Sequence, residues 1–252
     1  MSPDTAKWLL PAEAWRAGYL PPIDFQMHTT WTDGRSTAAD MIEAARARKL
    51  KAIAITEHFN EQSTWYPDFV AQMKELRQHE RDLEVYFGVE AAARDYRGGL
   101  KAEPGPADAE LVLGVVHSYP KEEGGFWSFA NVTPAQGLDM EIRALIGLTN
   151  NERVDVIGHP GGTTYRKFGA FPVERLEPVF RAAKERGKAI ELNTKYMWDL
   201  PGYLHLLWRI NPVVSFGSDA HSANDVGVNY TGLVDRWGEL TQASELPGIC
   251  AG

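Results

Sequence analysis

The stretch AIAITEH at residues 52–58 joins four apolar residues to a threonine, an acid and a histidine. A short, continuous apolar run is typical of a strand that is buried on both faces of a parallel sheet. The polar residues Glu57 and His58 fall at the carboxyl end of this run. The carboxyl ends of the strands in a parallel α/β barrel surround one mouth, where functional side chains gather. The stretch therefore predicts a buried parallel strand whose last residues belong to a functional site.

The same pattern recurs along the chain and accounts for five of its seven histidines. Matching runs end in a histidine or an acid at residues 23–28, 85–90, 112–117, 154–159 and 213–221, and a further strand is expected at residues 189–193. About seven strands result. Imidazoles and carboxylates that are distant in the sequence would converge at one mouth, which predicts a metal site. His79 and His205 lie in helix-like segments, and we expect both to stay outside that site.

Helical patterns alternate with these strands, which indicates βα units in an α/β fold. Helices are expected at residues 37–49, 69–78, 133–147, 173–186 and 203–209. Ser36 or Thr37 is a candidate amino-terminal cap, and Gly187 stands where a carboxyl-terminal cap is expected. Loops rich in glycine and proline are expected at residues 97–106, 120–125 and 160–163.

Length and composition limit the classes of function. The 252 residues are typical of one α/β barrel, so we expect a single domain over residues 1–252. The formal net charge of −8 disfavours nucleic-acid binding, which requires a basic surface. No apolar run approaches the roughly 18 residues of a transmembrane helix, and residues 1–22 lack the features of a signal peptide. The single Cys250 excludes an intrachain disulfide, in keeping with a cytoplasmic protein. The sequence leaves the oligomeric state open.

Taken together, the motifs resemble those of the PHP (polymerase and histidinol phosphatase) domain family. The first family motif is similar to QMHT at residues 26–29 followed by TDG at residues 32–34, and the second to ITEH at residues 55–58. Glu90, His117 and His159 match three later strand-end positions, and GSDAH at residues 217–221 matches the closing motif, so the resemblance spans residues 24–221. It implies a distorted seven-stranded (β/α)7 barrel, similar to a TIM barrel, with a trinuclear metal site.

Carried over residue by residue, the resemblance implies nine ligands for two or three divalent ions. The ligands of the first position are Gln26, His28, Glu90 and Asp219, those of the second are Glu90, His117 and His159, and those of the third are Asp33, His58 and His221. Mixed imidazole and carboxylate ligands suit manganese, zinc or iron, and they do not choose among these metals.

Three polar residues have more than one reading. Gln26 stands where the family usually has histidine. It could ligate a metal through its amide oxygen, leave its position partly occupied, or hydrogen-bond a metal-bound water, and it could also be a substitution introduced to slow turnover. Glu57 either orients an imidazole or is a strand-end charge. Glu191 either points into the barrel mouth or pairs with a cation.

The resemblance implies hydrolysis of a phosphate ester of a small metabolite, such as a nucleotide, a sugar phosphate or a compound like histidinol phosphate. A metal-bridged hydroxide would attack phosphorus, Glu90 would hold the spacing of the ions, and Asp219 or an adjacent histidine would relay a proton to the leaving group. Arg166 and Lys195 are the preferred phosphate-binding residues, with Lys167 and Arg94 as further candidates. Two alternatives stay open: a catalytically impaired domain with a structural or regulatory role, and a metal-dependent hydrolase of another ester or an amide.

Overall fold

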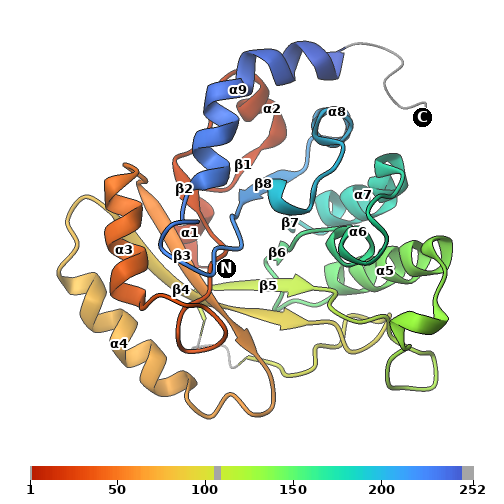
Figure 1. Cartoon of the computed structure of the whole chain (residues 1–252), viewed down its shortest axis with the longest axis horizontal. Coiled ribbons are helices and arrows are strands. Elements are labelled where there is room, and N and C mark those ends of the chain that lie inside the picture. The colour runs from red at the N-terminus through yellow and green to blue at the C-terminus, as the bar shows by residue number, and fades with distance from the viewer. Residues whose placement is uncertain (1, 105–108, 246–252) are drawn as a thin grey trace.

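The computed structural model describes residues 2–104 and 109–245, and its centre is a sheet of seven parallel strands (Figure 1). The strands are β2 (Ile23–Asp24), β3 (Ala52–Phe59), β4 (Glu84–Ala92), β5 (Leu111–Val115), β6 (Val156–Ile157), β7 (Ala189–Leu192) and β8 (Val213–Phe216). Each pairs with the next along the chain, from β2 to β8. All seven predicted strands are therefore confirmed. A short additional strand, β1 (Leu10–Pro11), lies antiparallel to β8 and was not expected.

The two ends of the sheet meet beyond β2 and β8. The backbone nitrogen of Phe25 donates to the carbonyl of Phe216 at 2.7 Å, and that of His28 donates to the carbonyl of Ala220 at 2.8 Å. Met27 and Ala220 form a parallel bridge. These contacts join the segments that follow the first and last parallel strands, which gives the fold its character of a distorted barrel. They also bring residues near position 26 beside residues near position 219.

Helices surround the strands (Figure 1). They are α1 (Pro3–Ala6), α2 (Ala12–Arg16), α3 (Ala38–Ala47), α4 (Tyr66–Gln78), α5 (Pro134–Thr149), α6 (Gly162–Phe168), α7 (Glu177–Glu185), α8 (Leu200–Ile210) and α9 (Val228–Glu245), with 3-10 turns η1 (Phe129–Asn131), η2 (Val173–Leu176) and η3 (Thr194–Tyr196). The expected helices correspond to α3, α4, α5, α7 and α8. Four helices, α1, α2, α6 and α9, were not expected.

Local chemistry explains where several of these elements begin and end. Thr37 caps α3 through a reciprocal pair of hydrogen bonds with Asp40, which decides between the two predicted caps. The helix expected at residues 173–186 is divided into η2 and α7, and Pro178 lies in the first turn of α7, where proline is favoured. Gly187 follows α7 with a φ of 65°, as a carboxyl-terminal glycine should. The loop expected at residues 160–163 is shorter, because α6 begins at Gly162.

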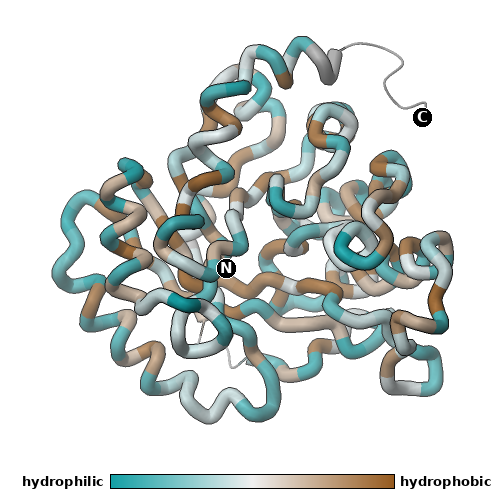
Figure 2. Tube along the Cα trace, viewed as in Figure 1, coloured by the Kyte–Doolittle hydropathy of each residue, from teal (hydrophilic) through white to brown (hydrophobic). Residues whose placement is uncertain are grey.

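Apolar side chains from the strands and the surrounding helices form two buried clusters. One lies beneath α3 and α4 and includes Met41 and Phe69. The larger cluster packs residues of the strands against α5, α7 and α8. Figure 2 shows apolar residues along the central strands and many hydrophilic residues on the peripheral helices and loops. Among the described residues, no helix is long and apolar enough to cross a bilayer. Cys250 lies outside the described residues.

Candidate metal centre

Glu90, at the carboxyl end of β4, is the centre of the predicted ligand cluster. Its side chain is almost fully buried. Oε1 lies 2.7 Å from Gln26 Nε2 and 3.1 Å from His159 Nε2. Oε2 lies 2.5 Å from His58 Nδ1 and 3.5 Å from His117 Nε2. One carboxylate therefore contacts residues that follow or end four other strands, which the sequence placed up to 133 positions apart.

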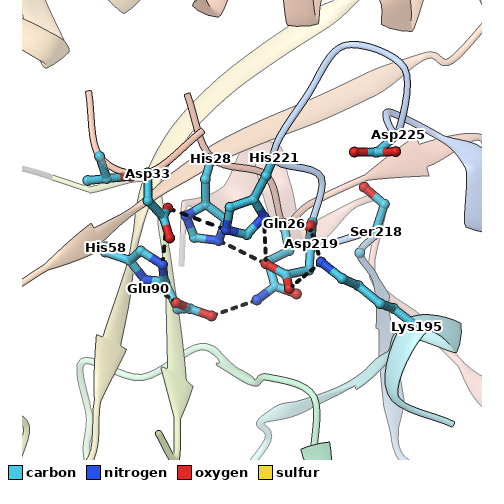
Figure 3. A network of polar contacts seen from close by, with 12 residues as sticks. Gln26, His28, Asp33, His58, Glu90, Lys195, Ser218, Asp219, His221 and Asp225 are labelled. Atoms are coloured by element: carbon cyan, nitrogen blue, oxygen red, sulfur yellow. Dashed lines mark hydrogen bonds and ion pairs between the residues drawn. The ribbon is translucent and has the colours of Figure 1, made fainter. Parts of the chain in front are cut away.

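The remaining predicted ligands form a second group beside Glu90 (Figure 3). His28 Nε2 lies 3.1 Å from Asp219 Oδ1. Asp33 Oδ1 lies 3.4 Å from His58 Nε2 and 3.3 Å from His221 Nε2. The His28 ring stacks on that of His58 with centroids 4.2 Å apart. All nine predicted ligands thus gather at one mouth.

The cluster is suited to metal ions because it contains buried polar atoms that the protein does not satisfy. Among the described residues, neither ring nitrogen of His28 makes a well-oriented hydrogen bond, and neither does Glu90 Oε2. Their close polar neighbours are other predicted ligands, Asp219 and His58. An unsatisfied buried polar atom costs about 1–3 kcal/mol, and coordination of a cation would remove that cost. Three sets of ligand atoms lie within 4.8 Å of one another: His28, His58 and His221; His58, Glu90 and His117; and His28, Glu90 and Asp219. The last set coincides with the first predicted position without Gln26.

The electrostatics of the group are strongly coupled. Burial opposes ionisation of Glu90, but the neighbouring histidines outweigh it and hold the pKa of Glu90 well below its usual value. Burial also disfavours the charged forms of His58 and His159, yet contact with Glu90 prevails and raises the pKa of each to about 9. For His117 burial prevails and lowers the pKa to about 4. The carboxylate is therefore ionised and attracts positive charge to this site.

Two of the predicted ligands have unusual backbone conformations. His159 has a φ of 27° and Asp219 a φ of 50°, both in a region that residues other than glycine seldom adopt. Buried carboxylates hold the backbone at both places. Glu191 accepts a 2.6 Å hydrogen bond from the backbone nitrogen of His159. Asp24 accepts from the nitrogen and the hydroxyl of Ser218, at 2.8 and 2.6 Å. These acids fix the backbone that presents the ligands.

The structure shows what the carboxylates of Glu57 and Glu191 contact. Glu57 is fully buried and accepts hydrogen bonds from the nitrogen and hydroxyl of Thr29, at 2.9 and 2.5 Å, and from the hydroxyl of Thr32. It thereby organises the segment that carries Asp33, rather than contacting an imidazole directly. Glu191 is buried inside the barrel next to the site, and its carboxylate forms no ion pair with a lysine or arginine among the described residues.

A cavity of about 630 Å³ opens over the cluster. Arg166, Lys167 and Lys195 line it together with Phe129. Lys195 Nζ lies 3.0 Å from Asp219 Oδ2 and 2.9 Å from the Asp219 carbonyl. Arg166 and Lys167 are exposed and form no ion pair within the described part of the chain. Arg94, by contrast, lines a separate cavity of about 290 Å³.

Sequence analysis did not identify the roles of three residues that support the site, which are Asp24, Asn193 and Tyr196. The hydroxyl of Tyr196 donates to Asp219 Oδ2. Asn193 Nδ2 donates to Gln26 Oε1 at 3.0 Å. The signal for Asn193 was available, since it is a polar residue at the end of a predicted strand, as the histidines are. The signal for Asp24 was its charge inside an apolar run. His79 and His205 are exposed, as expected.

Comparisons with known proteins agree with this arrangement. The sequence matches the family model described as PHP domain over residues 24–195. A protein of Acetivibrio thermocellus called "probable phosphatase" is 30% identical over 235 residues, which cover 89% of this chain and 88% of that protein. Another of that name, from Thermoanaerobacter sp., is 27% identical and is matched over 81% of both chains.

A solved structure with a similar fold is histidinol phosphate phosphatase from Lactococcus lactis, complexed with zinc, L-histidinol and phosphate. It has a TM-score of 0.66 and 17% sequence identity, and the match covers 90% of this chain and 95% of that one. The histidinol phosphatase of Listeria monocytogenes, described as putative, has the same TM-score at 15% identity, over 83% of this chain and 99% of that one. The family model spans well over half of the sequence, and the chain therefore belongs to the PHP domain family.

Proposed function

We propose that this protein is a metal-dependent phosphoesterase that hydrolyses a phosphate ester of a small metabolite. The observation that carries the proposal is the cluster of imidazoles and carboxylates around Glu90, with unsatisfied ligand atoms, at the base of a cavity lined by cations. The names of the relatives and the phosphate and zinc of the Lactococcus lactis enzyme support the same chemistry.

The ligands that we assign to the ions are the imidazoles and carboxylates of the cluster. They are His28, Asp33, His58, Glu90, His117, His159, Asp219 and His221. When bound, two or three divalent ions would lower the pKa of a bound water and stabilise negative charge on the phosphate. Manganese, zinc and iron all suit these ligands.

The chain's own side chains would bind and orient the substrate. Arg166 and Lys167, which form no ion pair with any described residue, place two cations beside the cavity, where they would attract an anionic substrate. Lys195 and Tyr196 both contact Asp219 Oδ2 and leave Oδ1 facing His28. They would therefore position this carboxylate, which could pass a proton to the leaving group. Glu90 contacts His58 and His117 through one carboxylate oxygen and His159 through the other, so it would keep these ligands at a fixed spacing.

The size of the cavity favours a substrate with an organic portion. Its volume of about 630 Å³ is several times that of a phosphate group, which leaves space for a ring or a sugar. Phe129 offers an apolar surface in the same cavity. We therefore assign the metal cluster to the scissile phosphate and the outer cavity to the rest of the metabolite.

The test is release of inorganic phosphate from nucleotides, sugar phosphates and histidinol phosphate with added Mn²⁺. A His221→Ala variant should lose the activity, because His221 contacts both Asp33 and Asp219. A His79→Ala variant is the matched control, since His79 is exposed at the end of α4. No release from any substrate by a metal-loaded protein would contradict the proposal. If inorganic phosphate also failed to bind at the site, hydrolysis of a non-phosphate ester or an amide would become the preferred function.

A further inference from the structure

Gln26 lies in a short chain of buried hydrogen bonds that begins at a backbone group. The backbone nitrogen of Lys195 donates to Asn193 Oδ1 at 3.1 Å. Asn193 Nδ2 donates to Gln26 Oε1 at 3.0 Å, and Gln26 Nε2 donates to Glu90 Oε1 at 2.7 Å. The side chains of Gln26 and Asn193 have no exposed surface. The two links made by Gln26 are therefore shielded from water, and the link to the Lys195 backbone is partly buried.

The backbone fixes the direction of the whole chain. A backbone N–H can only donate, so the group of Asn193 that faces it must be the oxygen. Asn229 Nδ2 also donates to this oxygen, at 3.4 Å, and so favours the same orientation of the Asn193 amide. The amide nitrogen of Asn193 then faces Gln26, which must present its oxygen to Asn193 and its nitrogen to Glu90. Turning the Gln26 amide around would place two NH₂ groups against each other and an oxygen against a carboxylate.

Packing fixes the base of the Gln26 side chain. A Cβ atom at Gly217 would lie 2.6 Å from Gln26 Cβ and 2.1 Å from Glu191 Oε1, so glycine at this position lets the chain approach Gln26 closely. The direction of the amide is then set by its hydrogen bonds. Reversal would leave buried amide groups unsatisfied, at a cost of about 1–3 kcal/mol for each.

The direction of the amide decides what Gln26 can offer to an ion. An amide nitrogen carries no available lone pair, and its hydrogens have partial positive charge. The ammonium of Lys195, 3.0 Å from Asp219 Oδ2, adds a full positive charge at the same position. The position formed by His28, Glu90 and Asp219 therefore has three protein ligands, and the groups beside it repel a cation.

We propose that Gln26 and Asn193 position Glu90 instead of ligating a metal, and that the position of His28, Glu90 and Asp219 binds its ion most weakly of the three. The inference rests on the metal centre proposed above. Two ions are then held tightly, and the third exchanges with the medium. The difference in affinity should be at least about tenfold, which is the order of magnitude by which neighbouring groups change metal affinity.

The decisive variant is Asn193→Asp, which keeps the shape of the side chain. A carboxylate at 193 can accept from both the Lys195 nitrogen and Gln26 Nε2, and Gln26 can then donate to only one of its two acidic neighbours. An ion on Glu90 favours donation to position 193, so in the metal-bound variant the amide turns and presents its oxygen to the metal position. Asn224→Asp is the matched control. It makes the same exchange three residues after His221, but Asn224 is exposed and belongs to none of these hydrogen bonds.

The measurement is equilibrium dialysis of the metal-free chain against Co²⁺, with metal analysis and the visible absorption of each bound equivalent. The wild type should take up two tight equivalents and one weaker equivalent. In the Asn193→Asp variant the third should bind about tenfold more tightly and with a changed spectrum. In the Asn224→Asp variant its affinity should stay within about twofold of the wild type.

Two results would overturn the inference. Three equivalents of equal affinity in the wild type would show that the position of His28, Glu90 and Asp219 is not the weakest, and this result requires no variant. A third equivalent that binds equally well in the wild type and the Asn193→Asp variant would show that the amide direction does not control the position. Uptake of no tight equivalent at all would instead refute the metal centre itself. In that case phosphate release by the metal-free protein should be measured. Release that persists would show that the protein is an enzyme without this metal centre.

Discussion

Two sets of buried polar side chains lie at the carboxyl ends of the strands, and they differ in how the protein treats them. Asp24 and Glu57 have hydrogen-bond donors on both carboxylate oxygens, from backbone nitrogens and hydroxyls of adjacent loops. Among the described residues, Glu90 Oε2 and both ring nitrogens of His28 have no such hydrogen bond and contact other predicted ligands instead, although they are as deeply buried. We call the first pair the loop-holding acids and the second pair the open ligands.

The difference separates structural from chemical roles within one small region. A buried carboxylate is tolerated when donors surround it, and the loop-holding acids use those donors to fix the segments that carry Asp33 and Asp219. The polar contacts of the open ligands are mostly with other predicted ligands, whose atoms surround them. Glu191 is intermediate, because Oε2 accepts from His159 and Oε1 has no partner. Substitutions in the two sets should therefore affect different properties.

The largest effect should come from an open ligand. Glu90→Gln keeps the shape of the side chain but removes the negative charge that lies between His58 and His159 and attracts ions to the cluster. We expect the loss of bound metal and a fall in kcat of more than about 100-fold. Metal analysis and phosphate release measure the two effects. A variant that retains its metal and activity would break the distinction between the open ligands and the loop-holding acids.

Removal of metal from the wild type tests the same distinction without a substitution. Ions that bind only the folded state at about 100 times their Kd stabilise it by about 2.7 kcal/mol. For a chain of this size we expect a chelator to lower the Tm by about 5–10 °C. Thermal unfolding followed by circular dichroism measures the shift. The Glu90→Gln variant should show almost no shift, and an equal shift in both proteins would place the stabilising ions elsewhere.

A loop-holding acid should behave in the opposite way. Glu57→Gln replaces one acceptor with a donor that faces Thr29 or Thr32, so we expect unfolding in urea to cost about 1–3 kcal/mol less. Metal affinity should fall less than in Glu90→Gln, and only at the position that contains Asp33. Full loss of metal at unchanged stability would mean that Glu57 is itself a ligand.

The smallest effect should come from the rim of the cavity. Arg166→Gln removes an unpaired cation that contacts neither set of buried groups, so we expect KM to rise about tenfold with kcat nearly unchanged. Steady-state kinetics on the best substrate distinguishes the two constants. Arg153→Gln is the matched control, because Arg153 is exposed and does not line this cavity. A fall in kcat instead would place Arg166 among the groups that act in the transition state.

The fold was largely predictable because its signals are local. A buried parallel strand requires a continuous apolar run, and each of the seven runs became a strand. The helix α6 was hidden because Gly161 and Gly162 are typical of a loop. Its first turn depends on Glu141 of α5, which accepts from the nitrogens of Thr163 and Thr164. No property of residues 162–168 themselves contains that information.

The sequence by itself determined the parallel barrel and the ligand types, since a histidine or acid that ends a buried strand must lie at the mouth. Only the tertiary structure decided what each polar group contacts. Contacts between the segment that follows β2 and the end of β8 place Gln26 beside Gly217 and Asn193, and a backbone N–H then sets which end of the Gln26 amide faces Glu90. Hydrogen bonds have direction, and direction depends on partners that are distant in the sequence. The residues could therefore be named from the sequence, whereas the division between loop-holding acids and open ligands required the folded chain.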